Sequence, residues 1–241
     1  MTGPMRPLRL SLGTALCLTL CKPRSFTGGQ VDRSLIHRIA TSYAPAHARP
    51  AVATLLSLEA QFAKCVFTAS EPILAQMRLA WWRDRFAQPS EEWPVGNPLL
   101  AELATWHAET SELGQVVDGW EALLANSPPT PADFEAYRRG RVAGWQVLAR
   151  HLGVSFDETG IAQASQRWSM ADAAASLGEP DARDAAMREG RKLAKPPRLP
   201  RALRTLTVLD AIGRRALESG APPLSRPSDL LSVLRHGLMG R

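Results

Sequence analysis

The sequence predicts one domain built from α-helices, and three observations support this prediction. The chain of 241 residues is long enough for one well-buried core and short for two full domains. Its apolar fraction of 45% and charged fraction of 22% are typical of globular proteins. Apolar residues recur at helical spacing between prolines and glycines, with no alternating strand pattern of useful length. Ten helices are expected, near residues 33–43, 46–69, 71–88, 97–109, 111–126, 131–152, 158–177, 182–194, 199–219 and 227–238.

Residue types at several helix ends support these boundaries. Thr130 is expected to be an N-cap, and Pro131 is expected at the first helical position. The negative charge of Asp133 is favourable in the first turn of a helix. Residues 70–72, Ser-Glu-Pro, predict a similar helix start. Left-handed C-terminal caps are expected at Gly153, Gly178 and Gly220.

The helix expected near residues 71–88 has apolar residues on two sides. A helix that is apolar on two sides is predicted to be buried on both, so this one should be central, with its two tryptophans buried on opposite sides. The two stripes are Ile73, Met77 and Trp81, and Leu79, Trp82 and Phe86.

The helix expected near residues 131–152 has one apolar stripe, which Arg141 interrupts. The side chain of Arg141 would either point into an internal cavity or extend its charged end into water along the helix surface. We favour the second interpretation, because long cationic side chains commonly cover apolar surface in this way.

The net charge of +6 is unevenly spread along the chain. Residues 1–30 contribute +4, and residues 183–215 hold ten basic and three acidic residues. An exposed basic face could meet an anionic membrane, RNA or an acidic partner. No pattern of aromatic residues for base stacking accompanies it, so nucleic acid is not expected as a partner. A solvated helix face followed by a linker is the favoured interpretation.

Cysteine and hydropathy patterns point to the cytoplasm. The three cysteines form no CxxC pair, which argues against a disulfide framework and a zinc site and favours a reducing compartment. No run of eighteen apolar residues occurs, which argues against a spanning helix.

Residues 1–30 are expected to lie outside the folded domain, which spans residues 31–241. Their basic start and apolar stretch resemble a signal peptide, but no small-x-small cleavage site follows. We interpret the segment as a disordered leader, or as an untranslated stretch before a true start at Val31.

Three stretches, in order, resemble the squalene/phytoene synthase family over about residues 35–240. They are Tyr-Ala-Pro at residues 43–45 with Arg-Pro-Ala at 49–51, the segment EPILAQMRLAWWRD at 71–84, and Leu-Pro-Arg-Ala-Leu at 199–203 with Leu-Asp-Ala at 209–211. The resemblance implies the all-helical isoprenoid synthase fold. Active members join two prenyl diphosphates head to head in a central cavity.

The same resemblance implies that the metal site is lost. Active members hold Mg²⁺ through two aspartate-rich motifs on facing helices, because Mg²⁺ must neutralise the leaving diphosphate. In this chain, the acidic positions of the first motif fall on Ala63, Lys64 and Phe67, and those of the second on Ser176 and Pro180. The chain is therefore similar to a degenerate branch of the family that includes a mitochondrial assembly factor for respiratory complex I.

A residual pocket is expected from the charged residues near these positions. Glu59 and Glu179 are the nearby carboxylates, one on each helix, and two carboxylates are too few to hold a Mg²⁺ cluster. Arg141, Arg78 and Arg83 complete the predicted pocket. Arg78 and Arg83 would bind a phosphate in a family enzyme, or pair here with Glu59, Glu71 or Asp84.

Other titratable residues show no pattern of a site. The five histidines, including His37, lack metal-ligand spacing and are interpreted as surface or helix-end residues. Asp172, Asp181 and Asp184 alternate with arginines and are interpreted as an exposed, ion-paired helix face.

Three functions remain open. The leading hypothesis is a non-catalytic binding or assembly scaffold with no cofactor, acting on a protein partner from a membrane or respiratory complex. The alternatives are an active Mg²⁺-dependent head-to-head prenyl transferase and a carrier for an isoprenoid or another lipid. We expect a cytoplasmic protein, peripheral to the inner membrane, whose contact with anionic lipid is weak and salt-dependent.

Overall fold

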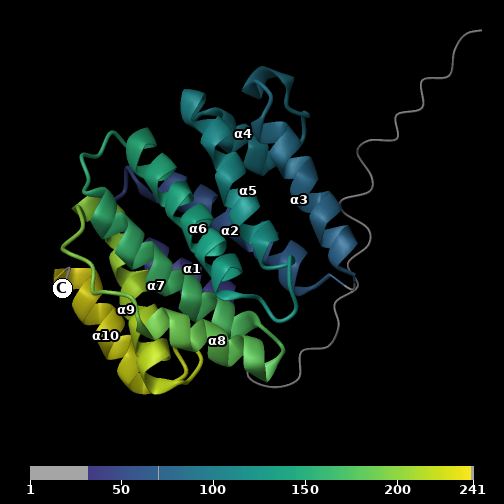
Figure 1. Ribbon diagram of the computed structural model, residues 1–241. Coiled ribbons are helices and arrows are strands. Elements are labelled where there is room, and N and C mark those ends of the chain that lie inside the picture. The colour runs from purple at the N-terminus through teal and green to yellow at the C-terminus, as the bar shows by residue number, and fades with distance from the viewer. Residues whose placement is uncertain (1–31, 70, 240–241) are drawn as a thin grey trace, which may run out of the picture.

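The computed structural model describes residues 32–69 and 71–239, which form helices and no strand (Figure 1). The predicted all-α fold is confirmed. The α-helices are α1 (Arg33–Ser42), α2 (Arg49–Phe67), α3 (Pro72–Phe86), α4 (Pro98–Ala104), α5 (Leu113–Ala122), α6 (Pro131–His151), α7 (Glu158–Ser176), α8 (Pro180–Arg191), α9 (Arg204–Ser219) and α10 (Pro227–Met239). Short 3-10 turns lie at Ser90–Glu92, His107–Glu112 and Arg201–Leu203. The expectations for residues 1–30 and for Ser70 lie outside the described residues.

The bundle is organised around α6 and α7, which pack against each other. Helix α5 covers α6 on one side and α9 covers α7 on the other, while α2 contacts both α5 and α6. Helix α3 lies at one edge, against α5 and α2, and α10 lies at the far corner against α9 (Figure 1). Large apolar side chains fill the interior, and Trp120, Trp145 and Trp168 are fully buried.

Two glycines allow α5 and α6 to pack at backbone contact. A Cβ atom at Gly140 would lie 2.6 Å from the Gln115 carbonyl oxygen and 2.7 Å from the Gly119 Cα atom. Any side chain there would push the helices apart. The arrangement places the buried face of α6, which carries Arg141, deep in the bundle.

The predicted helix ends are largely confirmed. Thr130 and Asp133 form a reciprocal capping box at the start of α6, and Gly153 and Gly220 adopt left-handed conformations with φ of 62° and 68°. The prediction for Gly178 is wrong, because it does not have a positive φ. Leu177 and Glu179, on either side of Gly178, are both extended, and at Glu179 the following Pro180 favours this conformation, so the chain between α7 and α8 does not coil into a left-handed cap.

The predicted central position of α3 is also wrong. Its inner side, with Leu79 and Trp82, is buried, but the opposite stripe faces outward. Ile73 is 55% exposed, Met77 is 64% exposed and Trp81 is 36% exposed. Helices α2 and α5 cover α3 from one side, and no described element covers the other.

No helix within the described residues is both long enough and apolar enough to cross a membrane.

Candidate functional site

A cluster of charged and polar side chains lies where α1, α2, α6 and α7 meet, and most of its members are buried. This arrangement is unusual, because charged groups are rarely buried unless they are paired. We call it the central cluster, and it consists of Arg33, His37, Glu59, Tyr137, Arg141, Asp172 and Ser176.

Arg141 is the hub of the central cluster. Its Nε and Nη2 atoms donate hydrogen bonds to the two carboxylate oxygens of Glu59 at 2.8 and 2.9 Å. Its Nη1 atom donates to Tyr137 Oη at 2.5 Å and to Asp172 Oδ2 at 3.2 Å. The ring centres of Trp120 and Tyr137 lie 5.0 and 5.5 Å from the guanidinium carbon of Arg141. Arg141 is 1% exposed, so the expectation that its charged end reaches water is wrong.

Asp172 connects the hub to α1. Arg33 Nε donates to Asp172 Oδ1 at 2.9 Å, and Arg33 Nη2 donates to Ser176 Oγ at 2.6 Å. The guanidinium of Arg33 also lies over the Phe67 ring, 5.6 Å from its centre. Asp172 is 5% exposed, so its interpretation as part of an exposed face is wrong, and it pairs with Arg33 and Arg141 from other helices instead of with the arginines interleaved in its own stretch.

The charges in the central cluster balance. The Arg33 and Arg141 cations face the Glu59 and Asp172 carboxylates. Burial raises the pKa of Asp172 by itself, but Arg33 and Arg141 outweigh burial and hold the pKa below its ordinary value. Burial raises the pKa of Glu59, and Arg141 opposes this effect. No surplus negative charge remains to attract a metal ion.

His37 extends the central cluster from α1 as a neutral base. It is 9% exposed, which corrects its interpretation as a surface residue, and its Nε2 atom has no hydrogen-bond partner among the described residues. Burial lowers the pKa of His37 to about 4, Asp172 opposes this shift, and Arg141 and Arg33 add to it. The ring is therefore neutral at physiological pH.

The five degenerate motif positions have different environments. Ala63 is buried in the core, Lys64 is exposed, and Phe67 packs edge-on against Trp120 with ring centres 5.8 Å apart. Ser176 belongs to the central cluster, where it accepts a hydrogen bond from Arg33 and donates one to the Asp172 carbonyl oxygen. Pro180 is exposed in the first turn of α8.

The two carboxylates of the central cluster lie at a fixed spacing from these motif positions. Glu59 precedes Ala63 by four residues on α2, and Asp172 precedes Ser176 by four residues on α7. Residues four apart share a helix face, so each of the two facing helices keeps one carboxylate, one turn before the expected acidic position. Arg141 lies between these two carboxylates and binds both.

The structure brings together only part of the predicted residual pocket. Glu59 and Arg141 pair, but Arg83 instead pairs with Asp118, at 2.7 Å, and with Glu121, both on α5. Arg83 does not pair with any of the partners expected from the sequence, because α5 packs beside α3.

The other two members of the predicted pocket lie apart from the central cluster. Arg78 is half-buried and forms no hydrogen bond or ion pair with a described residue. Glu179 is exposed just before α8, and its side chain forms no hydrogen bond or ion pair with a described residue.

The central cluster does not fit the Mg²⁺ ions that the family resemblance implies. Over residues 32–69 and 71–239, no group of three His, Cys, Asp or Glu side chains is placed to hold a metal ion. The two central carboxylates already accept hydrogen bonds from arginines. Two pockets, of about 520 and 480 Å³, are formed by surface segments near residues 155–157 and 190–195, and no residue of the central cluster lines them.

Sequence reasoning missed Arg33, His37 and Tyr137. Arg33 and His37 are four residues apart on a predicted helix, and Tyr137 and Arg141 are four residues apart on another. Two polar pairs at this spacing on otherwise apolar faces are a signal that could have indicated a buried polar site.

Comparison with known proteins identifies the family. The family model described as squalene/phytoene synthase matches residues 33–179, more than half of the chain. No curated protein and no solved structure matches the chain. The all-α bundle is consistent with the isoprenoid synthase-like fold of this family. On these grounds, the chain belongs to the squalene/phytoene synthase family.

Proposed function

We propose that this chain is a non-catalytic family member that acts by binding, as an interaction or assembly scaffold. The observation that carries the proposal is the position of Arg141, which binds carboxylates of both α2 and α7. In an enzyme of this type, facing carboxylates gather Mg²⁺ around a diphosphate. In this chain the cation between the carboxylates is the Arg141 side chain instead of Mg²⁺, and it stabilises the fold instead of binding a substrate.

The charge balance supports the proposal. A diphosphate bound with metal ions needs several carboxylates with unoccupied lone pairs. Arg33 and Arg141 already engage the Glu59 and Asp172 carboxylates. Removing one electrostatic contact from an active site commonly costs about a hundredfold or more in rate, so a site without the metal ligands should not turn over.

An apolar surface on α3 supports a binding role. Ile73, Leu74, Met77 and Trp81 are between 36% and 64% exposed and share one side of the helix. A contiguous exposed apolar patch commonly marks a protein interface. The partner that we propose is a protein of a membrane or respiratory complex, with the chain located in the cytoplasm or at the periphery of the inner membrane.

Two observations speak against the alternatives. An active prenyl transferase would need a second set of acidic ligands, and no such group occurs in the described part of the chain. A lipid carrier would need a large internal cavity, whereas both pockets described above are formed by surface segments.

Catalysis is tested with the purified chain, Mg²⁺ and farnesyl or geranylgeranyl diphosphate, beside an active family enzyme as positive control. We expect no product above the no-enzyme background, and Ala63→Asp should not create activity because one ligand cannot assemble a metal cluster. Turnover that a chelator abolishes would overturn the non-catalytic assignment.

Binding is tested in cells that express the chain with a photo-crosslinking residue in place of Met77. The matched control carries the same residue in place of Arg139, which lies exposed on α6. A defined protein adduct from the first position, and none from the second, is expected. Equal labelling from both positions would contradict a specific interface on α3.

A further inference from the structure

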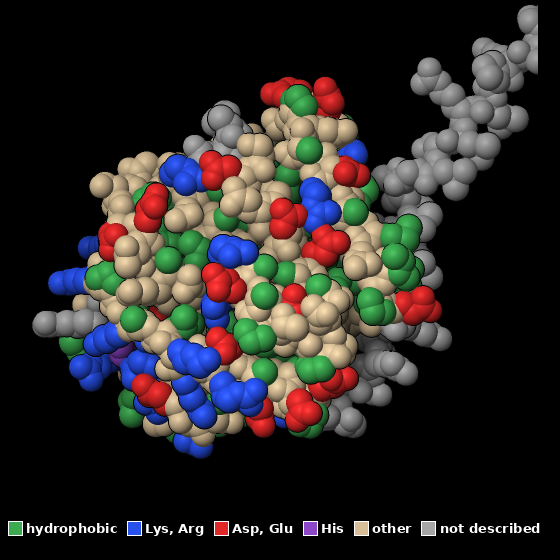
Figure 2. All heavy atoms as spheres, viewed as in Figure 1, with side chains coloured by type: hydrophobic (Ala, Val, Ile, Leu, Met, Phe, Trp, Pro, Cys, Tyr) green, Lys and Arg blue, Asp and Glu red, His purple; other side chains and the backbone are tan. Residues whose placement is uncertain are grey.

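A basic pocket lies at the corner of the bundle where the ends of α8, α9 and α10 meet. Its volume is about 480 Å³. Figure 2 shows Lys and Arg side chains gathered over this corner. Five cationic side chains line the pocket, against the single carboxylate of Glu218: Arg167, Arg191, Lys195, Arg214 and Arg235.

Two of these cations are neutralised within the protein. Arg167 donates two hydrogen bonds of 2.7 Å to the carboxylate of Asp210 beneath the pocket. Arg214 faces Glu218 at 3.2 Å across one helical turn. These pairs form the floor and one rim of the pocket, and they contribute no surplus charge.

The other three cations are not balanced. Arg191 donates to the carbonyl oxygen of Leu217 at 2.7 Å, which satisfies a hydrogen bond but leaves the positive charge uncompensated. Lys195 and Arg235 form no hydrogen bond or ion pair with any described residue. The pKa of His236 is lowered, first by burial and also by the nearby cations, which include Arg235 and Lys195. The pocket therefore presents three surplus positive charges to an anion.

Helix α10 borders this pocket, and its large apolar side chains lie on its outer side. Its inner side is buried, and a Cβ atom at Gly237 would overlap the Tyr43 ring. Its outer side has no partner within the described residues. We call it the α10 stripe, and it consists of Leu230 (50% exposed), Leu231 (69%), Leu234 (49%), Leu238 (74%) and Met239 (55%).

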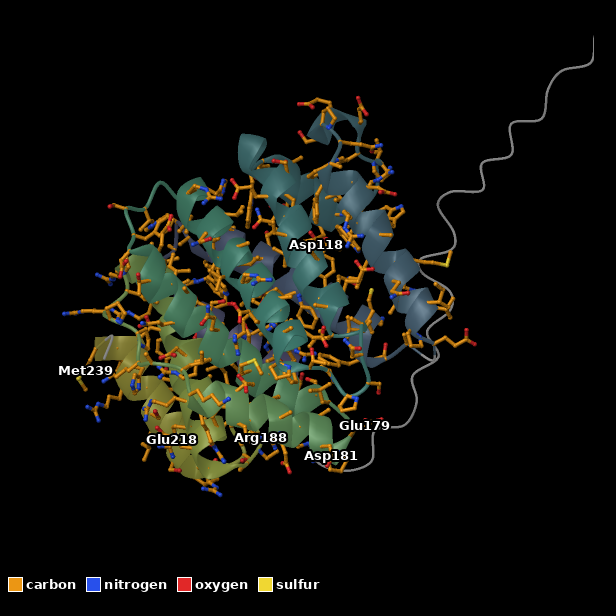
Figure 3. The ribbon with its side chains drawn as sticks, viewed as in Figure 1. Asp118, Glu179, Asp181, Arg188, Glu218 and Met239 are labelled. Atoms are coloured by element: carbon orange, nitrogen blue, oxygen red, sulfur yellow. The ribbon has the colours of Figure 1, made fainter. Side chains whose placement is uncertain are left out.

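The α10 stripe and the pocket meet along one ridge of the helix. Leu231, Arg235 and Met239 follow one another at intervals of four residues, so they lie in a row. Arg235 also lines the pocket. Figure 3 shows Met239 of α10 and Glu218 of α9 at this same corner.

We propose that this corner docks on an anionic phospholipid bilayer, with the α10 stripe in the interface and the pocket over a lipid phosphate. A helix with leucines on one side and arginine beside them is the pattern of a helix that lies in the membrane plane. Uncompensated lysine and arginine next to it are attracted to an anionic leaflet. A bilayer complements both features at once, because its headgroups carry the negative charge and its acyl chains accept the leucines.

Membrane docking through α10 goes beyond the proposed scaffold role, because it sets the orientation of the bundle on the membrane. Helices α3 and α10 lie at opposite edges of the bundle (Figure 1). Docking through α10 would leave the exposed stripe of α3 free to meet a protein. Docking through α10 also adds a hydrophobic contribution to the purely electrostatic membrane contact that residues 183–215 predict.

Vesicle flotation of the full chain tests the proposal, with phosphatidylcholine vesicles that contain or lack phosphatidylglycerol, at low and high salt. The wild type should float with the anionic vesicles and not with the neutral ones, and some binding should persist at high salt. Leu231→Ser combined with Leu238→Ser should weaken partitioning about tenfold or more, since the leucines supply the apolar contact. Lys195→Glu combined with Arg235→Glu should abolish the preference for anionic vesicles.

The matched control combines Ile73→Ser with Met77→Ser on α3, and it should bind like the wild type. All replaced residues are exposed, so circular dichroism and thermal melting should show intact folds. The proposal is overturned if the wild type fails to float with anionic vesicles, if it floats equally with neutral ones, or if either α10-corner variant binds within about twofold of the wild type. The diphosphate assay reports on catalysis independently, so failure of one proposal is distinguishable from failure of the other.

Discussion

Replacing Arg141 with methionine tests whether the central cluster is a structural replacement for a metal site. Methionine keeps much of the length of arginine and removes every hydrogen bond to Glu59, Asp172 and Tyr137. Asp172 keeps its pair with Arg33, but Glu59, 1% exposed, loses its counterion. Breaking a buried ion pair by removing one partner costs roughly 3–5 kcal/mol. For a domain of this size, this corresponds to a decrease in Tm of about 10 °C.

The pH dependence of this loss has a definite sign. In the Arg141→Met variant, only the charge of Arg33 still opposes burial, so the pKa of Glu59 should rise further and the native state should hold a proton that the unfolded state releases. Increasing the pH should then reduce the stability of the variant relative to the wild type. The destabilisation should therefore be smallest in mild acid.

Urea unfolding followed by circular dichroism measures the free energies. Arg139→Met is the matched control on the same helix, because Arg139 is exposed and its one ion pair within the described residues is with Glu135, at 3.4 Å. Its loss should therefore change stability by less than about 0.5 kcal/mol. Adding Glu59→Leu to Arg141→Met should recover at least half of the loss by removing the unpaired charge. A loss below about 1 kcal/mol for Arg141→Met would refute the assignment of Arg141 as the hub.

Two further variants test the interior. The pKa of His37 is lowered to about 4 in the native state. Between pH 6.5 and 4, the unfolded state therefore binds a proton that the native state does not bind, so the free energy of unfolding falls as the pH falls. His37→Gln should remove about 3 kcal/mol of this decrease, as measured by urea unfolding at several pH values, and parallel pH profiles for the variant and wild type would contradict the buried neutral ring. Gly140→Ala should cost about 1–3 kcal/mol by forcing α5 and α6 apart. Gly114→Ala is its control, since a Cβ atom at Gly114 would meet nothing within 4 Å, and equal stability of the two variants would contradict close contact at Gly140.

The sequence predicted the helical fold and many helix ends because both depend on local information. Helical periodicity, prolines at first positions and glycines after last turns act within a few residues of one another. The capping box of Thr130 and Asp133 is an example, since all of its atoms lie within one turn of α6. Gly178 was mispredicted because the chain on both sides of it, at Leu177 and Glu179, is extended, and Pro180 favours this conformation at Glu179.

The position of α3 illustrates what periodicity leaves open. Its two apolar stripes are compatible with burial on two sides or with burial on one side and exposure on the other. Only the packing of neighbouring helices distinguishes these cases, and α5 and α2 cover one side alone. The stripe of Ile73, Met77 and Trp81 is therefore a surface in this fold.

By itself, the sequence determined the all-α class, the family and the absence of acidic residues at Ala63, Phe67 and Ser176. The tertiary structure alone decided that Arg141 would bind Glu59, 82 positions earlier in the chain, and Asp172, 31 positions later. The physical reason is that the state of a charged side chain depends on its surroundings after folding. An arginine is stable in the core only where carboxylates from other helices meet it, and those partners are brought together by packing.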